Sequence, residues 1–563
     1  MGEARRHGRV RDAAAAFTSN WRNPNLRRAQ LSFLGAWTAE WAFTVALGIV
    51  AYRDGGAVAL GLVGLLRMLP SAILAPLLSP IADRGRRERV LVLVSVVRGL
   101  ATAAAALVAA LSGPVVVIYA LAVLSTIAAT LYRPAHSALL PSLCRTGHEL
   151  ASANVVRGLL DSAATLVGPL LAAVLLQYTG VDVVFAVAAA ASFWAAALLL
   201  RLRYDAPPRP SAPKHPNLPR EAADGIRAVV QNHDLTLVLA LAAAQALTRG
   251  ALTVLSVVVA IELLGTGEPG VGALMTAVGV GAVLGSLAAS LLVGTGRLGV
   301  WFAVGVGLWG LPFTLIGLAP AEIPALGLLA FVGVGNALID VAGFTLIARM
   351  APDEVLARVF GVLESLVAVF IGIGAVVASV LVEWFGVETA LIAIGLVCPV
   401  LALLSLRRLR GMDSSVDVLD EQIGLLQRVR MFRALPLPSI EQLARGMESV
   451  EVAAGAAVFR QGDPGDRFYV IEMGEADVVG DGRVVATLGP GEGFGEIALL
   501  RSTRRTATVV ARSALALRAL GSERFLPVVL GYTASTSAAA VVVDGQLDRY
   551  SPKEPFDDAP PPS

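Results

Sequence analysis

The sequence predicts a polytopic α-helical membrane protein, with twelve transmembrane helices in two six-helix repeats, followed by a cytoplasmic α+β domain. The first observation behind this fold class is composition: the 563 residues are 56% hydrophobic and 16% charged, with a mean hydropathy of +0.71. Soluble globular proteins are about 45–50% apolar and about 25% charged, so a soluble, disordered or collagen-like chain is excluded. The second observation is a change of pattern near residue 410, where long apolar stretches give way to short strands broken by glycines.

Twelve apolar stretches are long enough to cross a bilayer, which requires about 20 mostly apolar residues. They lie near 29–52, 57–79, 89–112, 114–135, 152–177 and 182–201, and then near 234–262, 271–293, 299–318, 324–348, 358–383 and 388–406. The segment 178–182 recurs as 384–388, which supports two repeated halves. Chance similarity among helices rich in Ala, Gly and Val is the alternative explanation.

Arginines mark the side of the membrane on which both termini are expected. Loops that share a side with the N-terminus carry many arginines, such as Arg201 and Arg407, whereas the opposite loops carry acids such as Asp54 and Glu268. Positively charged loops stay in the cytoplasm, so we expect both termini to be cytoplasmic and the protein to lie in the plasma membrane. Two lysines among 45 basic residues, with much Ala, Gly and Val, indicate a GC-rich bacterial genome.

Changes in composition divide the chain into seven segments. They are a cytoplasmic N-terminal segment (1–28), a first membrane half (29–203), a proline-rich cytoplasmic linker (204–232), a second membrane half (233–408), a connector helix (409–434), an α+β domain (435–548) and a disordered tail (549–563). Within the linker, the stretch 221–230 is amphipathic and is expected to lie on the membrane surface.

The loop after the second predicted span carries the motif Asp83-Arg84-Gly85-Arg86-Arg87. It resembles the signature G-x-x-x-D-R-x-G-R-R of the major facilitator superfamily, although Ser79 and Arg86 replace the two glycines. The resemblance implies a secondary transporter in which Asp83, Arg84 and Arg87 form a cytoplasmic gate, because an acid at a helix end can pair with arginines. A positively charged loop without a gate is the alternative.

Other segments are similar to the branch of this superfamily that includes enterobactin exporters and macrolide efflux pumps. Gly168-Pro169-Leu170-Leu171-Ala172-Ala173 resembles the exporter motif G-P-x-x-G-G, with alanine in place of both final glycines. Arg133-Pro134-Ala135 and Arg67-Met68-Leu69-Pro70 also match that branch. The resemblance therefore implies export of a small molecule.

Ionisable groups inside the predicted spans are candidates for transport or coupling, because each is costly to insert into a bilayer. Glu40 and Arg249 lie in the middle of the first and seventh spans, and Asp340 lies beside Asn336 in the tenth. We expect Glu40 and Arg249 to face each other across a central cavity, either as a substrate or proton site or as a fixed ion pair. Charges placed nearer helix ends are Arg67, Arg98, Arg157, Asp161 and Glu364. For the last three, gate salt bridges or snorkelling toward the membrane surface are expected in place of substrate contact.

Residues 491–508 carry the most specific motif in the chain. Gly491-Glu492-Gly493-Phe494-Gly495-Glu496-Ile497-Ala498-Leu499-Leu500, followed by Arg504-Arg505-Thr506-Ala507, resembles the phosphate-binding cassette of cyclic nucleotide-binding domains. The turn glycines Gly462, Gly465 and Gly474 match the same family. The resemblance implies a β-roll with flanking helices, including a hinge at 522–530 and a lid at 533–548.

This resemblance also implies the nucleotide-binding residues, which are Gly495, Glu496, Ile497, Ala498, Arg505 and Thr506. Backbone N–H groups at the start of a short helix favour an anion, and Arg505 would pair with the phosphate. Glu496 would accept the ribose 2′-hydroxyl. The regulatory ligand is cAMP or cGMP, and a domain that has lost binding is the alternative.

Catalysis is not expected from this sequence. Cys144 and Cys398 lack metal or redox spacing, and there is no nucleophile triad, Walker loop or metal cluster. We therefore expect no enzyme activity and no cofactor. The net charge of +2 gives no reason to expect a nucleic-acid partner.

The function that follows is secondary transport regulated by a cyclic nucleotide. The expected partners are the lipid bilayer, the nucleotide and an unknown small-molecule substrate. Three alternatives stay open: a transporter with a silent C-terminal domain, a membrane receptor for cyclic nucleotides that transports nothing, and an exporter of the nucleotide itself.

Overall fold

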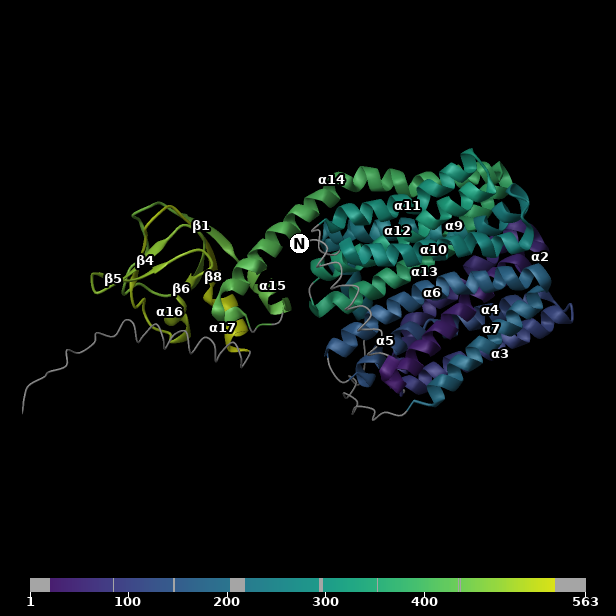
Figure 1. The fold of residues 1–563 in the computed structure, drawn as a ribbon, viewed down its shortest axis with the longest axis horizontal. Helices are drawn as coiled ribbons and strands as arrows, with labels where there is room; N and C mark the ends of the chain where they lie inside the picture. Colours follow the sequence, from purple (N-terminus) through teal and green to yellow (C-terminus); the bar gives the residue numbers. More distant parts are fainter. Residues whose placement is uncertain are drawn as a thin grey trace, which may run out of the picture. The chain divides into compact units, whose positions relative to one another are not determined.

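The structure is a computed structural model that describes residues 21–84, 86–144, 147–202, 218–292, 297–351, 353–433, 435 and 437–531 (Figure 1). The chain forms two compact units, Met1–Asp413 and Ser414–Ser563. The expected tail 549–563 and lid helix 533–548 lie outside the described residues, as do most of the N-terminal segment 1–28 and of the linker before Leu218.

Long apolar helices make up the first unit. In chain order they are α2 (Pro24–Arg84), α3 (Arg87–Ala110), α4 (Val115–Ala129), α5 (Tyr132–Leu143), α6 (Gly147–Tyr178), α7 (Val181–Leu200), α8 (Leu218–Gln231), α9 (His233–Val258), the π-helical turn η1 (Val259–Leu263), α10 (Gly267–Leu292), α11 (Leu298–Leu318), α12 (Glu322–Met350), α13 (Asp353–Phe385) and α14 (Val387–Arg428). Among the described residues, eleven helical stretches are long and apolar enough to cross a membrane.

The difference between eleven stretches and the twelve expected spans arises in α2. This element joins the first two expected spans, and its backbone leaves the helical region at Gly55 and Gly56, where φ is +59° at Gly56. A positive φ is readily adopted by glycine, so the chain changes direction there. Its apolar stretch, Pro24–Leu74, has 51 residues, which is long enough for two crossings.

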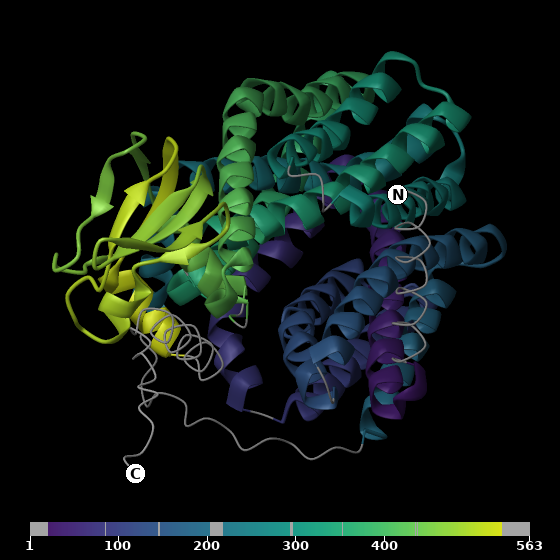
Figure 2. The same ribbon diagram turned by 60° about the vertical axis from the view of Figure 1, so that its left-hand side comes forward.

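The helices of the first unit gather into two groups, with α2 to α7 in one and α9 to α14 in the other (Figure 2). In the first group α3 and α2 pack on α7, and in the second α10 and α11 pack on α12. The groups meet where α6 packs on α10 and α2 packs on α13. The halves expected from the sequence therefore contact each other mainly through these two helix pairs, with a smaller contact of α2 on α9.

The amphipathic stretch of the linker forms α8, which packs on α13. A Cβ atom added at Gly225 would lie 3.0 Å from the carbonyl oxygen of Arg358, and the Arg358 guanidinium pairs with Asp224 at 3.3 Å. Membrane-surface placement was the expectation for this stretch. The structure holds α8 against α13 through a close backbone contact and an ion pair, and its placement at the membrane surface stays a prediction.

Two glycines set the close approach of α9 and α13. A Cβ atom at Gly250 would lie 1.9 Å from the carbonyl oxygen of Ile371, and one at Gly374 would lie 1.9 Å from that of Leu247. Small residues allow helix backbones to approach in this way. The core of the second half therefore depends on these two positions having no side chain.

We predict that Gly250→Ala lowers the melting temperature of the purified protein, because overpacking a helix contact typically costs about 1–3 kcal/mol. The matched control is Gly307→Ala in α11, where an added Cβ atom meets nothing within 4 Å. Thermal unfolding in detergent measures both. Equal melting temperatures for the two variants would show that the α9–α13 contact is looser than the structure has it.

The second unit is an α+β domain with two four-stranded antiparallel sheets. Its elements are the 3₁₀ turn η2 (Arg430–Phe432), α15 (Leu437–Arg445), β1 (Glu448–Val452), β2 (Ala457–Phe459), β3 (Arg467–Met473), β4 (Ala476–Gly480), β5 (Arg483–Leu488), β6 (Gly493–Phe494), α16 (Glu496–Leu500), β7 (Thr508–Ala511), β8 (Leu515–Gly521) and α17 (Ser522–Leu530). The sheet orders are β1-β8-β3-β6 and β2-β7-β4-β5. Helix α17 lies at the residues expected to form the hinge helix, whose role as a hinge stays a prediction.

A second hydrophobic core joins the C-terminal end of α14 to the sheet and to α17. Leu426 is fully buried in it, and the ring of Phe432 meets those of Phe468 and Phe525 edge-on at 5.6 and 6.0 Å between centroids. Helix α14 continues from the last apolar stretch through the expected connector to Arg428. The last turns of α14, which belong to the second unit, are therefore part of the core of the α+β domain.

Candidate functional site

The expected phosphate-binding cassette forms a tight turn into the short helix α16. Gly495 precedes this helix with φ at +93°, a left-handed conformation that glycine adopts without strain. A Cβ atom there would lie 2.6 Å from Nη1 of Arg505. Glu496 begins the helix and is 1% exposed, while Ile497 and Ala498 are also buried and Thr506 is exposed.

Arg505 lies beneath this turn and is 4% exposed. Its Nη1 donates to the carbonyl oxygen of Gly495 at 3.0 Å, and its Nη2 donates to that of Arg467 at 2.8 Å. The closest carboxylate recorded, that of Asp466, lies 3.9 Å away and is largely exposed. Among the described residues, Nε of Arg505 has no hydrogen-bond partner, which leaves one N–H of a buried cation available to an anion.

Aromatic rings complete the surroundings of this guanidinium. Its central carbon lies 4.1 Å from the ring centroid of Phe459 and 5.9 Å from that of Tyr469. Burial lowers the pKa of Arg505 below its ordinary value, and the neighbouring Tyr469 and Asp466 oppose that change. Burial likewise raises the pKa of Tyr469, against the effect of the Arg505 charge. A phosphate would add the negative charge that a buried cation needs.

The cavity at this site is small. Phe459, Gly495, Ala498, Arg505 and Thr506 are among the residues that surround a volume of about 40 Å³, comparable with the roughly 30 Å³ that one water molecule takes up in the liquid. A nucleotide is much larger than this. Binding therefore requires the pocket to widen or most of the nucleotide to lie outside it.

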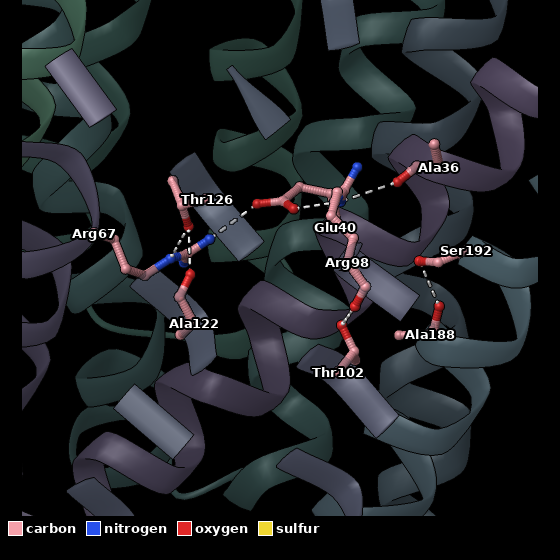
Figure 3. Close-up of polar contacts among 9 residues, drawn as sticks. All are labelled: Ala36, Glu40, Arg67, Arg98, Thr102, Ala122, Thr126, Ala188 and Ser192. Carbon is pink, nitrogen blue, oxygen red and sulfur yellow. Dashed lines mark hydrogen bonds and ion pairs between the residues drawn. The ribbon is translucent and has the colours of Figure 1, made fainter. Parts of the chain in front are cut away.

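In the membrane unit, Glu40 of α2 lies between two arginines (Figure 3). Its carboxylate pairs with Arg67 at 2.9 Å and with Arg98 of α3 at 2.5 Å, and Nε of Arg67 donates to the hydroxyl of Thr126 at 3.0 Å. The structure therefore does not show the alternative, a fixed ion pair of Glu40 with Arg249, because both ion partners of Glu40 among the described residues come from its own half. A role of Glu40 and Arg249 as a substrate or proton site stays a prediction. Arg98 lies in the middle of α3 and not near its end.

A large cavity of about 2140 Å³ lies between the two halves. All four transport candidates from the sequence line it, together with charges that the sequence placed near helix ends: Glu40, Arg249, Asn336, Asp340, Arg157, Asp161 and Glu364. The amide of Asn336 donates to Asp340 at 2.9 Å. Residues of both halves therefore contribute charge to one space, as the resemblance to a transporter predicts.

Two contacts join the halves beyond one end of this cavity, and we call them the clasp. The hydroxyl of Tyr52 donates to Glu262 at 2.6 Å, and Arg53 donates twice to the carboxylate of Glu268 at 2.6 and 2.7 Å. None of these four residues lines the cavity. The clasp therefore connects α2 to η1 and α10 at a place that the cavity does not reach.

Of the expected gate residues, Arg87 is the one whose side chain the structure describes. It donates to the carbonyl oxygen of Ala138 and, at 3.4 Å, to the hydroxyl of Ser142. The side chains of Asp83 and Arg84 lie outside the described residues. The gate therefore stays a prediction.

Comparison with known families decides the class of the membrane unit. The family model of the Major Facilitator Superfamily matches residues 31–259 and 239–436. The chain belongs to the Major Facilitator Superfamily. This superfamily consists of transporters and not of enzymes, as the sequence predicted. The chain is therefore a multi-pass membrane protein.

This superfamily member also carries a cyclic nucleotide-binding domain, whose family model matches residues 449–532. Over 103 residues it is 42% identical to a cAMP-dependent protein kinase regulatory subunit of Schizosaccharomyces pombe, covering 18% of this chain and 25% of that one. Over 99 residues it is 37% identical to the uncharacterized protein Rv0104 of Mycobacterium tuberculosis, covering 18% and 19%. The chain thus spans about a quarter or less of these curated relatives.

Among solved structures, the chain is similar to the regulatory domain of Toxoplasma gondii PKA crystallised with cAMP. The identity is 29%, the match covers 23% of this chain and 50% of that chain, and the TM-score is 0.20.

Several site residues escaped the sequence analysis. Phe459 and Tyr469 face Arg505 from β2 and β3, which belong to different sheets, so the alternation of side chains along each strand does not show that the two rings meet the same guanidinium. Arg133 pairs with Asp161 at 3.0 Å and lies over the ring of Trp37. No spacing rule reveals that contact, because it joins helices α5, α6 and α2 in space.

We predict that Gly495→Ala weakens cAMP or cGMP binding by about tenfold or more, since a left-handed conformation costs an L-residue roughly 1–2 kcal/mol and the new methyl group would displace Arg505. Gly489→Ala is the control, because a Cβ atom there meets nothing within 4 Å. Isothermal titration calorimetry on the full-length protein measures both. Equal affinities would contradict the placement of the turn against Arg505.

Glu40→Gln is expected to lower the melting temperature strongly, because removing one partner of a buried ion pair costs about 3–5 kcal/mol. The guanidinium groups of Arg67 and Arg98 would then lose the carboxylate with which both of them pair. Glu383→Gln, at an exposed position of α13, should leave the melting temperature unchanged. If the Glu40→Gln variant has the same melting temperature as the wild type, the ion pairs of Glu40 with Arg67 and Arg98 do not stabilise the first half.

Proposed function

We propose that the protein is a secondary transporter of the plasma membrane that exports a small molecule and is regulated by cAMP or cGMP bound to its cytoplasmic domain. In this proposal α2 crosses the membrane twice, so the chain makes twelve crossings and both termini are cytoplasmic. The arginine-rich loops support that orientation. The likeness of 168–173 to an exporter motif supports the direction of transport.

The position of the clasp supports an inward-facing conformation. The cavity reaches Ile226 and Val230 of α8 and Arg358 of α13, which lie on the arginine-rich side that we assign to the cytoplasm. On the opposite side, Arg53 and Glu268 join the halves. A carrier that alternates between two openings needs contacts of this kind that form on one side and break on the other.

The single observation that carries the proposed regulation is that α14 is one unbroken helix from Val387 to Arg428. Where its apolar stretch Val387–Asp413 ends, Asp413 is 5% exposed and accepts from the backbone N–H groups of Gly299 and Val300 at 2.6 and 3.1 Å. It therefore caps the N-terminus of α11, where a carboxylate is favoured by the helix dipole. Movement of α14 is transmitted to α11 through these two bonds.

At its C-terminal end, α14 is held by the nucleotide-binding domain. Leu426 lies in the same core as Phe432 and Phe525, and Phe525 belongs to the expected hinge helix α17. Nucleotide bound near Arg505 would change the position of α17 and, through this core, of α14. The nucleotide shifts the carrier only if it binds the two carrier states with different affinity.

The test is cytoplasmic access to the cavity. Ser162 lines the cavity, so a Ser162→Cys variant in inside-out vesicles reacts with a membrane-impermeant maleimide when the cavity is open to the cytoplasm. We predict that cAMP or cGMP changes this labelling rate, by at most about 100-fold at 100 times its dissociation constant. The wild type, with Cys144 and Cys398 only, gives the background.

Two variants separate the steps of the proposal. Arg505→Ala should abolish both nucleotide binding and the response, while Asp413→Asn should keep binding and reduce the response. Asp234→Asn is the matched control, because Asp234 pairs with Arg408 of α14 in an exposed ion pair, which contributes about 0–1 kcal/mol. Binding without any change of labelling in the Ser162→Cys protein would establish a silent nucleotide domain instead.

A further inference from the structure

The central cavity contains a cluster of six charged side chains, which we call the charge cluster. Three arginines and three acids form it, and both halves contribute: Arg133, Arg157 and Asp161 from the first half, and Arg249, Asp340 and Glu364 from the second. Arg133 and Arg249 each interact electrostatically with all three acids. The cluster has no net formal charge.

Two of these charges are already satisfied within the first half. Arg133 pairs with Asp161 at 3.0 Å and lies 4.9 Å from the ring centroid of Trp37. Arg157 donates to the hydroxyl of Ser137 at 2.6 Å, a neutral partner. The first half therefore offers one closed ion pair and one arginine whose charge is not matched at contact distance.

The second half contributes the charges that lack close ion partners. Among the described residues, Arg249, Asp340 and Glu364 make no ion pair within 4.0 Å, and Asp340 accepts from the neutral amide of Asn336. Asp340 and Glu364 are exposed to this space. Charges in a low-dielectric space gain most from a partner of opposite sign, so both signs are available to a ligand here.

The rest of the cavity wall is largely apolar, with Trp41, Leu252, Met275, Trp309 and Phe344 among its residues. The volume of about 2140 Å³ exceeds the 300–1,000 Å³ that is typical of small-molecule pockets. A ligand that fills it needs an apolar body. The charged groups of such a ligand must bind to the acids and arginines of the charge cluster.

We propose that the transported substrate is a zwitterionic amphiphile, with an ammonium group that meets Asp340 and Glu364, an anionic group that meets Arg249 and Arg157, and an apolar body against the wall. This rests on the proposed function of the cavity as the transport path. A purely cationic ligand would add a charge beside Arg249, and a purely anionic one would add a charge beside the two acids. A zwitterion leaves the neutral cluster neutral, which avoids an uncompensated charge.

The experiment compares three charge forms of one scaffold, on two scaffolds. Purified full-length protein is titrated with ciprofloxacin, its ethyl ester and its N-acetyl derivative, and with phenylalanyl-leucine, its methyl ester and its N-acetyl derivative. In each set the parent is a zwitterion, the ester a cation and the N-acetyl form an anion. We expect the zwitterion to bind more tightly than both relatives by about tenfold or more on at least one scaffold, which corresponds to about 1.4 kcal/mol.

Variants test whether the cluster sets this preference. Asp340→Asn with Glu364→Gln should shift the preference toward the N-acetyl anion, and Arg249→Gln should shift it toward the ester. A role in folding alone would weaken all three forms together. Glu383→Gln, outside the cavity, should keep the wild-type order.

Three results overturn the proposal: equal affinity for the three charge forms, tighter binding of the ester or the N-acetyl form on both scaffolds, or no binding of either zwitterion. These results are independent of the proposed regulation, because the maleimide experiment uses no substrate. If the nucleotide leaves cavity labelling unchanged while the zwitterions bind, the proposed regulation is contradicted and the proposed substrate class is supported.

Discussion

The guanidinium of Arg505 is buried, yet its hydrogen bonds go to two carbonyl oxygens, those of Gly495 and Arg467, and not to a carboxylate. A buried cation held by neutral dipoles is stabilised less than one held by an anion. Nucleotide phosphate would supply that anion at a place where α16 also presents backbone N–H groups. The tight turn at Gly495 exists because only glycine fits above this arginine. The binding chemistry of the domain depends on that one interaction.

The proposed transmission from nucleotide to carrier depends on a second buried charge, that of Asp413. The carboxylate of Asp413 accepts from two backbone N–H groups at the start of α11, and Asp413 belongs to the same helix whose C-terminal end carries Leu426 into the core of the nucleotide-binding domain. The proposed regulation requires α14 to carry a displacement from one unit to the other. One helix thus has a polar anchor in the membrane unit and an apolar anchor beyond it.

Much of the architecture could be predicted from the sequence, because long apolar runs and glycine-broken strands are local signals. Strand β8 escaped prediction: its Leu515–Leu520 core consists of Leu, Ala and Arg, which favour helices when isolated, and pairing with β1 and β3 overrides that preference. The phosphate-binding cassette could be predicted because its glycines and its arginine are close in the chain. The hydrogen bond of Arg505 to the carbonyl oxygen of Arg467 could not be predicted, since the two residues are 38 positions apart.

In the membrane unit, the sequence identifies which residues carry charge but not which way each helix is rotated. Glu40 and Arg249 both line the cavity, but the sequence did not show that the Glu40 carboxylate pairs with Arg67 and Arg98 of its own half. A rotation of one helix about its axis exchanges such partners without altering the apolar pattern. Only the packing of small residues, such as Gly168 against Trp41, sets that rotation.

Hydrogen–deuterium exchange on the full-length protein, with and without saturating cAMP or cGMP, tests the coupling of nucleotide to carrier most directly. If α14 carries the signal, the amides of Gly299 and Val300, which Asp413 binds, change their exchange rate together with those of 493–500. If the nucleotide alters exchange within 449–531 and leaves the start of α11 unchanged, the domain binds its ligand without acting on the transporter.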